Sequence, residues 1–147
     1  FKGINRRFDK HIDTEKLVYI DDYAHHPEEV SATIDATKQL YPSRDLIVVF
    51  QPHLFSRTKD FANDFAISLQ GADDLVLLDI YPAREKPIEG IDSEWLLSKT
   101  ECNMGKVVST ENLLETIKEL KPEVLITAGA GDIDKTIEPI ISLFSEE

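Results

Sequence analysis

The stretch Tyr19-Ile20-Asp21-Asp22-Tyr23-Ala24-His25-His26-Pro27-Glu28-Glu29-Val30 is the most informative part of the chain. It begins in an apolar run that is typical of a buried strand, and it continues through two carboxylates, an aromatic ring and two histidines. Pro27 then suits the first position of a helix, and Glu28 and Glu29 favour the helix dipole in the first turn. A strand, a polar loop and a helix start are therefore predicted within this one stretch.

The remaining strands and helices are predicted on both sides of that stretch. Upstream, Arg7–Ile12 and Lys16–Ile20 are separated by a short turn, which predicts an antiparallel hairpin. Downstream, continuous apolar runs, typical of strands covered on both faces, alternate with segments of helical periodicity. The expected strands are 46–50, 75–80, 106–108 and 124–127, and the expected helices are 27–41, 61 to about 71, 93–99 with Asp92 or Ser93 as cap, 111–120 with Thr110 as cap, and 133–144. The pattern predicts an α/β fold with a mostly parallel sheet of about six strands.

Composition and charge limit the classes of function. With 147 residues, 41% hydrophobic and 30% charged, the chain is expected to form one soluble globular domain. Its net charge of −12 argues against nucleic-acid or anionic-membrane binding. No apolar run is long enough to span a membrane, and no secretory leader opens the chain. The single Cys102 fits a reducing cytoplasm, and a start at Phe1 suggests a piece of a longer protein.

Four polar loops are predicted at one edge of the sheet, where open α/β sheets bind ligands outside the carboxyl ends of their strands. Every arginine except Arg44 and every histidine except His11 lies in or beside these loops. An acidic chain that concentrates its planar cations in this way suits a small anion such as phosphate or carboxylate. The loops are 21–27, 51–58, 81–86 and 129–132.

The loop after the second strand allows two interpretations. Asp22 could hold a ribose or a metal, Tyr23 could stack on a base, and His25 could bind an anion. A helix cap with surface histidines would give the same residues. Its place at the ligand edge of the sheet favours the functional interpretation.

The other loops are less specific. Gln51-Pro52-His53 with Arg57 could clamp a carboxylate, or the arginine could lie on the surface over a packed histidine. Gly129-Ala130-Gly131 is interpreted as a plain turn between strand and helix, and Arg6-Arg7 is either a phosphate contact or a solvated strand end. No residues have zinc-ligand spacing, and no Gly-x-x-x-x-Gly-Lys-Ser/Thr phosphate loop occurs.

Five motifs in order resemble the C-terminal domain of the Mur ligase family. The resemblance covers nearly the whole chain and implies a Rossmann-like three-layer domain over residues 1–147. It also implies that an N-terminal UDP-sugar domain and a central ATPase domain lie outside this chain, which would explain the missing phosphate loop. The motifs are Arg6-Arg7-Phe8-Asp9, Asp21-Asp22-Tyr23-Ala24-His25-His26-Pro27, Phe50-Gln51-Pro52-His53 with Ser56-Arg57-Thr58, Asp79-Ile80-Tyr81-Pro82-Ala83-Arg84-Glu85 and Gly129-Ala130-Gly131-Asp132.

The resemblance implies an ATP-dependent ligase reaction. The motifs are most similar to those of members that join L-alanine to UDP-N-acetylmuramate through an acyl phosphate, in peptidoglycan precursor synthesis. ATP and Mg²⁺ are the implied cofactors, with Mg²⁺ held mainly by the central domain, and the isolated chain is expected to be inactive. The alternatives are the ligase that attaches recycled murein tripeptide to the same sugar, which we expect to lack Phe-Gln-Pro-His, a non-catalytic nucleotide-binding module, and an interaction domain without a small-molecule site.

Site residues carry over by position in the motifs. Those implied for ATP are Arg7, Asp22 and Tyr23, and those implied for L-alanine are His25, His53 and Arg57. No catalytic residue and no metal ligand is implied in this chain. Many family members have an arginine directly after the histidine of the Gln-Pro-His motif, where this chain has Leu54. The predicted carboxylate site therefore has one arginine fewer, and binding of the carboxylate is expected to depend more on Arg57.

Overall fold

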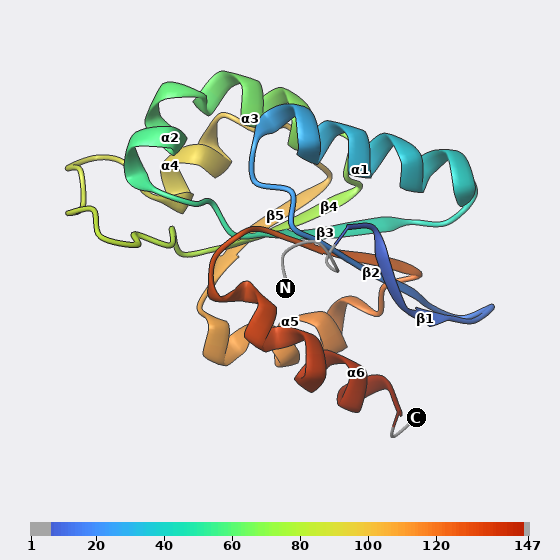
Figure 1. The fold of residues 1–147 in the computed structure, drawn as a ribbon. Helices are drawn as coiled ribbons and strands as arrows, with labels where there is room; N and C mark the ends of the chain where they lie inside the picture. The colour runs from blue at the N-terminus through green and yellow to red at the C-terminus, as the bar shows by residue number, and fades with distance from the viewer. Residues whose placement is uncertain (1–6, 146–147) are drawn as a thin grey trace.

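The computed structural model, which describes residues 7–145, contains one six-stranded sheet between two layers of helices (Figure 1). The strand order is β1-β2-β6-β3-β4-β5. β1 is antiparallel to β2, and every other neighbouring pair is parallel. The predicted fold class is confirmed. The strands are β1 (Asp9–Asp13), β2 (Val18–Asp22), β3 (Leu46–Phe50), β4 (Asp74–Leu78), β5 (Met104–Val108) and β6 (Val124–Ala128).

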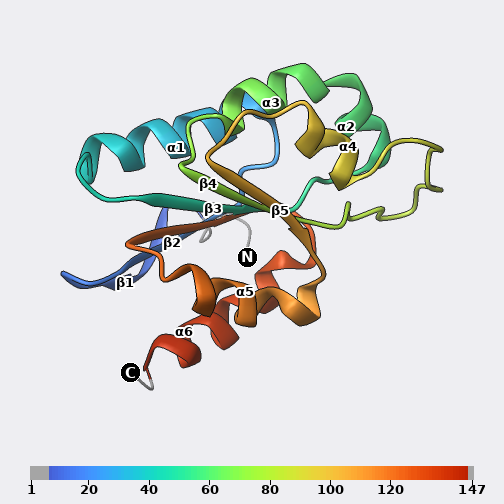
Figure 2. The same ribbon diagram turned by 180° about the vertical axis from the view of Figure 1, so that it is seen from behind.

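The helices form a separate layer on each side of the sheet, as the two opposite views show (Figures 1 and 2). On one side lie α1 (Pro27–Leu40), α2 (Phe55–Asp60), α3 (Ala62–Leu69) and α4 (Ser93–Ser98), and on the other lie η2 (Thr110–Asn112), α5 (Leu113–Leu120), η3 (Asp132–Thr136) and α6 (Ile137–Ser145). Successive residues of the buried strand β3 supply the two cores in turn, Val48 to one and Val49 to the other. Within residues 7–145, no helix has the length and apolar character that a membrane crossing requires.

Strand β2 extends further than its apolar run predicts. It ends at Asp22 rather than Ile20, and both aspartates at its end are buried. The reason lies in the neighbouring strand, because β6 pairs Thr127 with Asp21. The Thr127 hydroxyl donates to Asp21 Oδ1 at 2.7 Å and lies 2.8 Å from the Tyr19 hydroxyl. Buried polar groups are tolerated in the strand because they hydrogen-bond one another.

The helix after β3 starts earlier than predicted. Residues Phe55–Asp60 already form α2, so the expectation of a loop as far as Thr58 was wrong. Phe61 lies between α2 and α3 and is 43% exposed, whereas Phe65 is 1% exposed and belongs to the core. The predicted helix from 61 to about 71 thus corresponds to α3 (Ala62–Leu69), and Phe61 itself lies just outside it.

Two cap predictions have different outcomes. Asp92 caps α4, because its side chain accepts a hydrogen bond from the Trp95 backbone N–H at 2.8 Å. Thr110 was wrong as a cap, since Ser109 occupies the N-cap position and Thr110 is the first residue of the 3₁₀ segment η2. The last predicted helix also begins as a 3₁₀ segment, η3, before α6.

Strand β6 is last in the sequence but lies between β2 and β3. The chain passes from β2 through β3 and β4 to β5 with helices on one face, and then returns through α5 on the other face. The loops after β2 and β3 consequently flank the turn after β6 at the same sheet edge. Such a reversal of direction is where open α/β sheets bind their ligands.

Candidate functional site

Asp22 anchors the loop that follows β2. Its carboxylate accepts hydrogen bonds from the backbone N–H of Phe8 (3.1 Å) and Ala24 (3.0 Å) and from the Thr33 hydroxyl (2.9 Å). These donors come from the start of β1, from the loop itself and from α1. Asp22 is only 5% exposed. The residue therefore ties three segments together and holds the loop in place.

The start of α1 is organised by Glu29. Its Oε1 accepts from the backbone N–H of His25 (3.2 Å) and His26 (3.1 Å). Partial burial alone would raise the pKa of Glu29, but these hydrogen bonds and the His25 charge outweigh burial, so the pKa lies below its ordinary value. His25 Nδ1 lies 2.9 Å from the carbonyl oxygen of Tyr23. A proton on Nδ1 then donates to that carbonyl, which leaves Nε2 for other partners. Nε2 accepts a hydrogen bond in the neutral ring and donates one in the charged ring.

Arg7 lies on the outer side of this loop. Its Nη1 is 3.3 Å from Glu29 Oε2, and its Cζ is 5.9 Å from the centre of the Tyr23 ring. The Arg7 side chain is 55% exposed, so this ion pair is screened and weak. Its guanidinium is therefore accessible to a ligand. Arg6, the other half of the predicted phosphate contact, lies outside the described residues.

The loop after β3 is joined to the loop after β4. His53 and Tyr81 form an isolated parallel bridge, with Leu54 N–H donating to the Tyr81 carbonyl and Tyr81 N–H to the Pro52 carbonyl, both at 2.8 Å. The His53 and Tyr81 rings are stacked with centroids 5.4 Å apart. Leu54 has φ +72° and ψ 137°, a conformation that is strained for a residue other than glycine. The surrounding hydrogen bonds hold this strained residue where the chain turns into α2.

Arg57 is the third residue of α2 and is half-buried. His53 precedes the helix, so the two side chains do not share a helical face. Arg57 is nevertheless close enough for its charge to lower the pKa of His53.

The structure brings five of the predicted residues into one group, which we call the cation cluster: Arg7, Tyr23, His25, His53 and Arg57. The rings of His25 and Tyr23 meet edge to face at 5.1 Å, and those of His25 and His53 lie 6.0 Å apart. The three rings thus follow one another, with Arg7 beside Tyr23 at one end and the charge of Arg57 near His53 at the other. Asp22 lies beneath this group as its buried support.

His53 has an unusual proton affinity within the cation cluster. Burial comes first among the causes that lower its pKa, followed by the positive charges of Arg57 and His25. Its Nδ1 is buried and has no hydrogen-bond partner among residues 7–145. The neutral ring is therefore favoured, and it offers an N–H without adding a further charge.

An NMR titration of the His53 ring is expected to give a midpoint below the ordinary value of about 6.5. Arg57→Ala should move the midpoint upward, because one repelling charge is removed. Since the folded chain binds this proton less readily than the unfolded chain, the free energy of unfolding should decrease as the pH falls below about 6.5. His53→Asn assigns the signal, and a midpoint at or above the ordinary value would contradict the expected environment.

Gln51 closes the turn after β6. It is 4% exposed, its Nε2 donates to Asp132 Oδ1 at 2.8 Å, and its Oε1 accepts from the Ile133 backbone N–H at 3.0 Å. Gly129 has φ +149° and lies 3.1 Å, measured from an added Cβ, from the Gln51 carbonyl oxygen. These contacts support the interpretation of 129–131 as a structural turn rather than a phosphate cradle.

Gly131→Ala is expected to destabilise the chain by about 1–3 kcal/mol, the usual cost of overpacking. The new Cβ would lie 2.5 Å from Tyr81 Cγ and 2.7 Å from Gln51 Oε1. Urea denaturation measures the loss. Gly90→Ala is the control, because it meets no atom within 4 Å although its φ is +82°, so only backbone strain of about 1 kcal/mol applies. Equal losses of stability in the two variants would show that the Tyr81 side chain moves aside without a cost in free energy.

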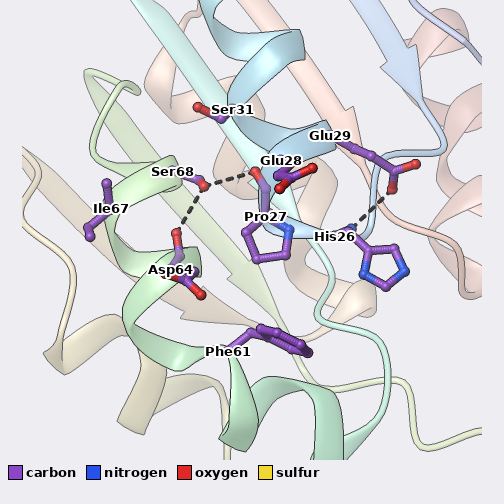
Figure 3. Close-up of a pocket in the computed structure, with 9 residues that line it drawn as sticks. All are labelled: His26, Pro27, Glu28, Glu29, Ser31, Phe61, Asp64, Ile67 and Ser68. Atoms are coloured by element: carbon purple, nitrogen blue, oxygen red, sulfur yellow. Dashed lines mark hydrogen bonds between the residues drawn. The ribbon is translucent and has the colours of Figure 1, made fainter.

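A separate pocket of about 650 Å³ lies beside the cation cluster, between the start of α1 and α3 (Figure 3). Its character differs from that of the cluster, because exposed apolar side chains, Phe61 and the 67% exposed Ile67, stand beside carboxylates. Sequence reasoning missed it, since its lining comes from α1 and from the segment around α3, which are distant in sequence. Its lining residues are His26, Pro27, Glu28, Glu29, Ser31, Phe61, Asp64, Ile67 and Ser68.

The fold and its ligand edge define a Rossmann-like α/β domain with a cation cluster at the switch point of the sheet. Residues 6–134 match the family described as "Mur ligase, glutamate ligase domain". The chain belongs to the Mur ligase family, and the resemblance inferred from the motifs is confirmed.

Two relatives and one solved structure with more specific names are similar to this chain. The chain is 56% identical over 137 residues to the UDP-N-acetylmuramate–L-alanine ligase of Flavobacterium psychrophilum, covering 93% of this chain and 31% of that protein. It is 52% identical over 146 residues to the ligase of the same name from Flavobacterium johnsoniae, covering 99% and 32%. The crystal structure of UDP-N-acetylmuramate-alanine ligase from Thermotoga maritima superposes with a TM-score of 0.73 at 25% identity, covering 96% of this chain and 30% of that one. The chain thus spans about a third of the length of these relatives.

Proposed function

We propose that this chain is the C-terminal domain of an ATP-dependent ligase that joins L-alanine to UDP-N-acetylmuramate in peptidoglycan precursor synthesis. The observation that carries the proposal is the cation cluster, in which His25, His53 and Arg57 gather donors suited to a small carboxylate. The names of the relatives support L-alanine as the amino acid. The UDP-sugar domain and the central ATPase domain are assigned to the rest of a longer bacterial polypeptide that works in the cytoplasm.

The amino-acid end of the cluster is assigned to Arg57, His53 and His25. Arg57 supplies a planar fork that can bind a carboxylate through two hydrogen bonds. His53, favoured in its neutral form, adds an N–H donor without a second charge. With Leu54 in place of the arginine that many members have, the negative charge of the ligand depends chiefly on Arg57.

The nucleotide end is assigned to Arg7, Tyr23 and Asp22. The exposed Arg7 guanidinium suits ATP phosphates, and the Tyr23 ring lies between it and His25. Asp22 contributes mainly by holding the loop, since three protein donors already occupy its carboxylate. ATP would then be bound between this domain and the central one.

In the proposed reaction, a carboxylate oxygen of UDP-N-acetylmuramate takes the γ-phosphoryl group of ATP and ADP leaves. The amine of L-alanine attacks the resulting acyl phosphate, loses a proton and displaces inorganic phosphate. This domain contributes by holding the amino acid against the acyl carbon, which makes the step effectively unimolecular. Mg²⁺ would neutralise phosphate charge, and the proposal leaves it to the central domain. Within residues 7–145 no group of three or more His, Cys, Asp or Glu side chains is placed to hold a metal ion.

The test is a ligation assay with the full-length protein that contains this domain. With UDP-N-acetylmuramate and ATP, we expect L-alanine to release ADP and form the amide, and murein tripeptide to give much less product. Preference for the tripeptide would favour the recycling ligase instead. We expect the isolated chain to form no product, because the phosphate loop is supplied by another domain. Product formation by the isolated chain would contradict that division of the site, and tight ADP binding by the isolated chain would favour a nucleotide-binding module.

A further inference from the structure

The long loop between β4 and α4, which extends away from the sheet in Figure 1, is fastened to α2 by one carboxylate. Glu85 accepts hydrogen bonds from both the backbone N–H of Ser56 (3.0 Å) and the Ser56 hydroxyl. Glu85 is itself set by a tight turn, in which its N–H donates to the Pro82 carbonyl at 2.8 Å and Ala83 has φ +52°. The loop therefore presents this carboxylate to the first turn of α2.

Ser56 directly precedes Arg57 in that turn. The other attachment of the same loop is Tyr81, which stacks on His53 and hydrogen-bonds to the backbone on both sides of it. The loop thus contacts the segment after β3 at two points, one beside His53 and one beside Arg57. Movement of Ser56 away from Glu85 would move Arg57 with it.

The Ser56 contact also leaves Arg57 available. Among residues 7–145, Arg57 forms no ion pair, although Glu85 lies close enough for the two charges to interact. A carboxylate without other donors would be expected to pair with a neighbouring guanidinium. The backbone N–H and the hydroxyl of Ser56 instead hold the Glu85 carboxylate at the first turn of α2.

We propose that Glu85 is a positioning residue for amino-acid binding, which acts through Ser56 to fix the first turn of α2 and keep Arg57 free for the ligand carboxylate. This inference rests on the proposed function and adds a residue to it. Hydrogen bonds from Ser56 keep the pKa of Glu85 below its ordinary value, so the carboxylate is ionised at neutral pH. It does not touch the substrate in this account.

The experiment uses the full-length ligase and compares Ser56→Ala, Glu85→Ala and the double variant. The KM for L-alanine is expected to rise about tenfold in Glu85→Ala, and by less in Ser56→Ala, which keeps the backbone N–H donor. The KM for ATP should stay within about twofold. Ser56→Ala removes only the hydroxyl hydrogen bond, whereas Glu85→Ala removes that bond and the one from the Ser56 backbone N–H. The double variant should therefore be no worse than Glu85→Ala alone. Ser56→Thr, which retains the hydroxyl, should have the wild-type KM for alanine.

Glu89→Ala is the matched control, since Glu89 is an exposed carboxylate in the same loop, and its alanine KM should not change. Alanine KM values within about twofold of wild type in both single variants would overturn the inference, as would a parallel rise in the KM for ATP or multiplicative effects in the double variant. A wild-type enzyme that does not ligate L-alanine would instead contradict the proposed function. The two failures are therefore distinguishable.

Discussion

Arg57→Ala in the full-length ligase is expected to raise the KM for L-alanine about a hundredfold, while the KM for ATP changes less than about threefold. The guanidinium of Arg57 is the one permanently charged group that the proposal places on the amino-acid carboxylate. His53 is favoured as a neutral ring, and Leu54 adds no charge. Loss of two charge-assisted hydrogen bonds therefore leaves no other permanent cation among the assigned residues to replace them. Initial-rate measurements with each substrate varied in turn give both constants.

Two variants control this measurement. Arg57→Lys should give an intermediate KM for alanine, because an ammonium retains the charge but not the bidentate geometry. Arg44→Ala should leave both constants unchanged, since Arg44 lies just before β3 at the opposite edge of the sheet and donates to the Thr14 carbonyl at 3.2 Å. An unchanged alanine KM in Arg57→Ala would remove Arg57 from the carboxylate site, and an equal rise for ATP would place it elsewhere in the active site.

Asp22→Ala is expected to lower the free energy of unfolding by about 3–5 kcal/mol, which is large against the stability of a domain. The buried carboxylate satisfies the backbone N–H of Phe8 and Ala24 and the hydroxyl of Thr33. Its removal leaves the two backbone N–H groups without an acceptor in a place that water reaches poorly, while the Thr33 hydroxyl can still donate to the Glu29 carbonyl at 3.0 Å. Urea denaturation of the chain, followed by circular dichroism, measures the loss.

Asp35→Ala is the matched control for this prediction, because Asp35 is an exposed aspartate on α1 and should change stability by no more than about 0.5 kcal/mol. Asp22→Asn should cost less than Asp22→Ala, since the amide oxygen still accepts hydrogen bonds. A loss below about 1 kcal/mol in Asp22→Ala would show that the loop and the start of β1 are not held by this carboxylate.

The fold was predictable because its signals are local. Leu46–Phe50 and Val124–Ile126 are continuous apolar runs, and the helices between the strands show their own period and caps such as Asp92. The failures occurred where a partner distant in sequence sets the outcome. The end of β2 depends on pairing with β6, where Thr127 stands opposite Asp21.

The candidate site was predictable in position but not in its connections. Parallel strands oblige the loops after β2, β3 and β4 to share an edge, so the grouping of His25 with His53 follows from the strand pattern. No local signal indicates that Glu85 bonds to Ser56, 29 residues away, or that Gln51 closes a turn near Asp132, 81 residues away. The pocket at Phe61 was missed for the same reason.

The sequence by itself determined the strands, the layer order of the domain, the family motifs and the edge at which we expect a ligand, because each of these follows from side-chain periodicity or from residues adjacent in the chain. Only the tertiary structure decided what the polar residues of that edge do. It made Asp22 a buried anchor, lowered the pKa of His53 beside Arg57, and joined Glu85 to Ser56. Burial, pKa and hydrogen-bond partners depend on which segments meet in space, and that is known only once the sheet has assembled.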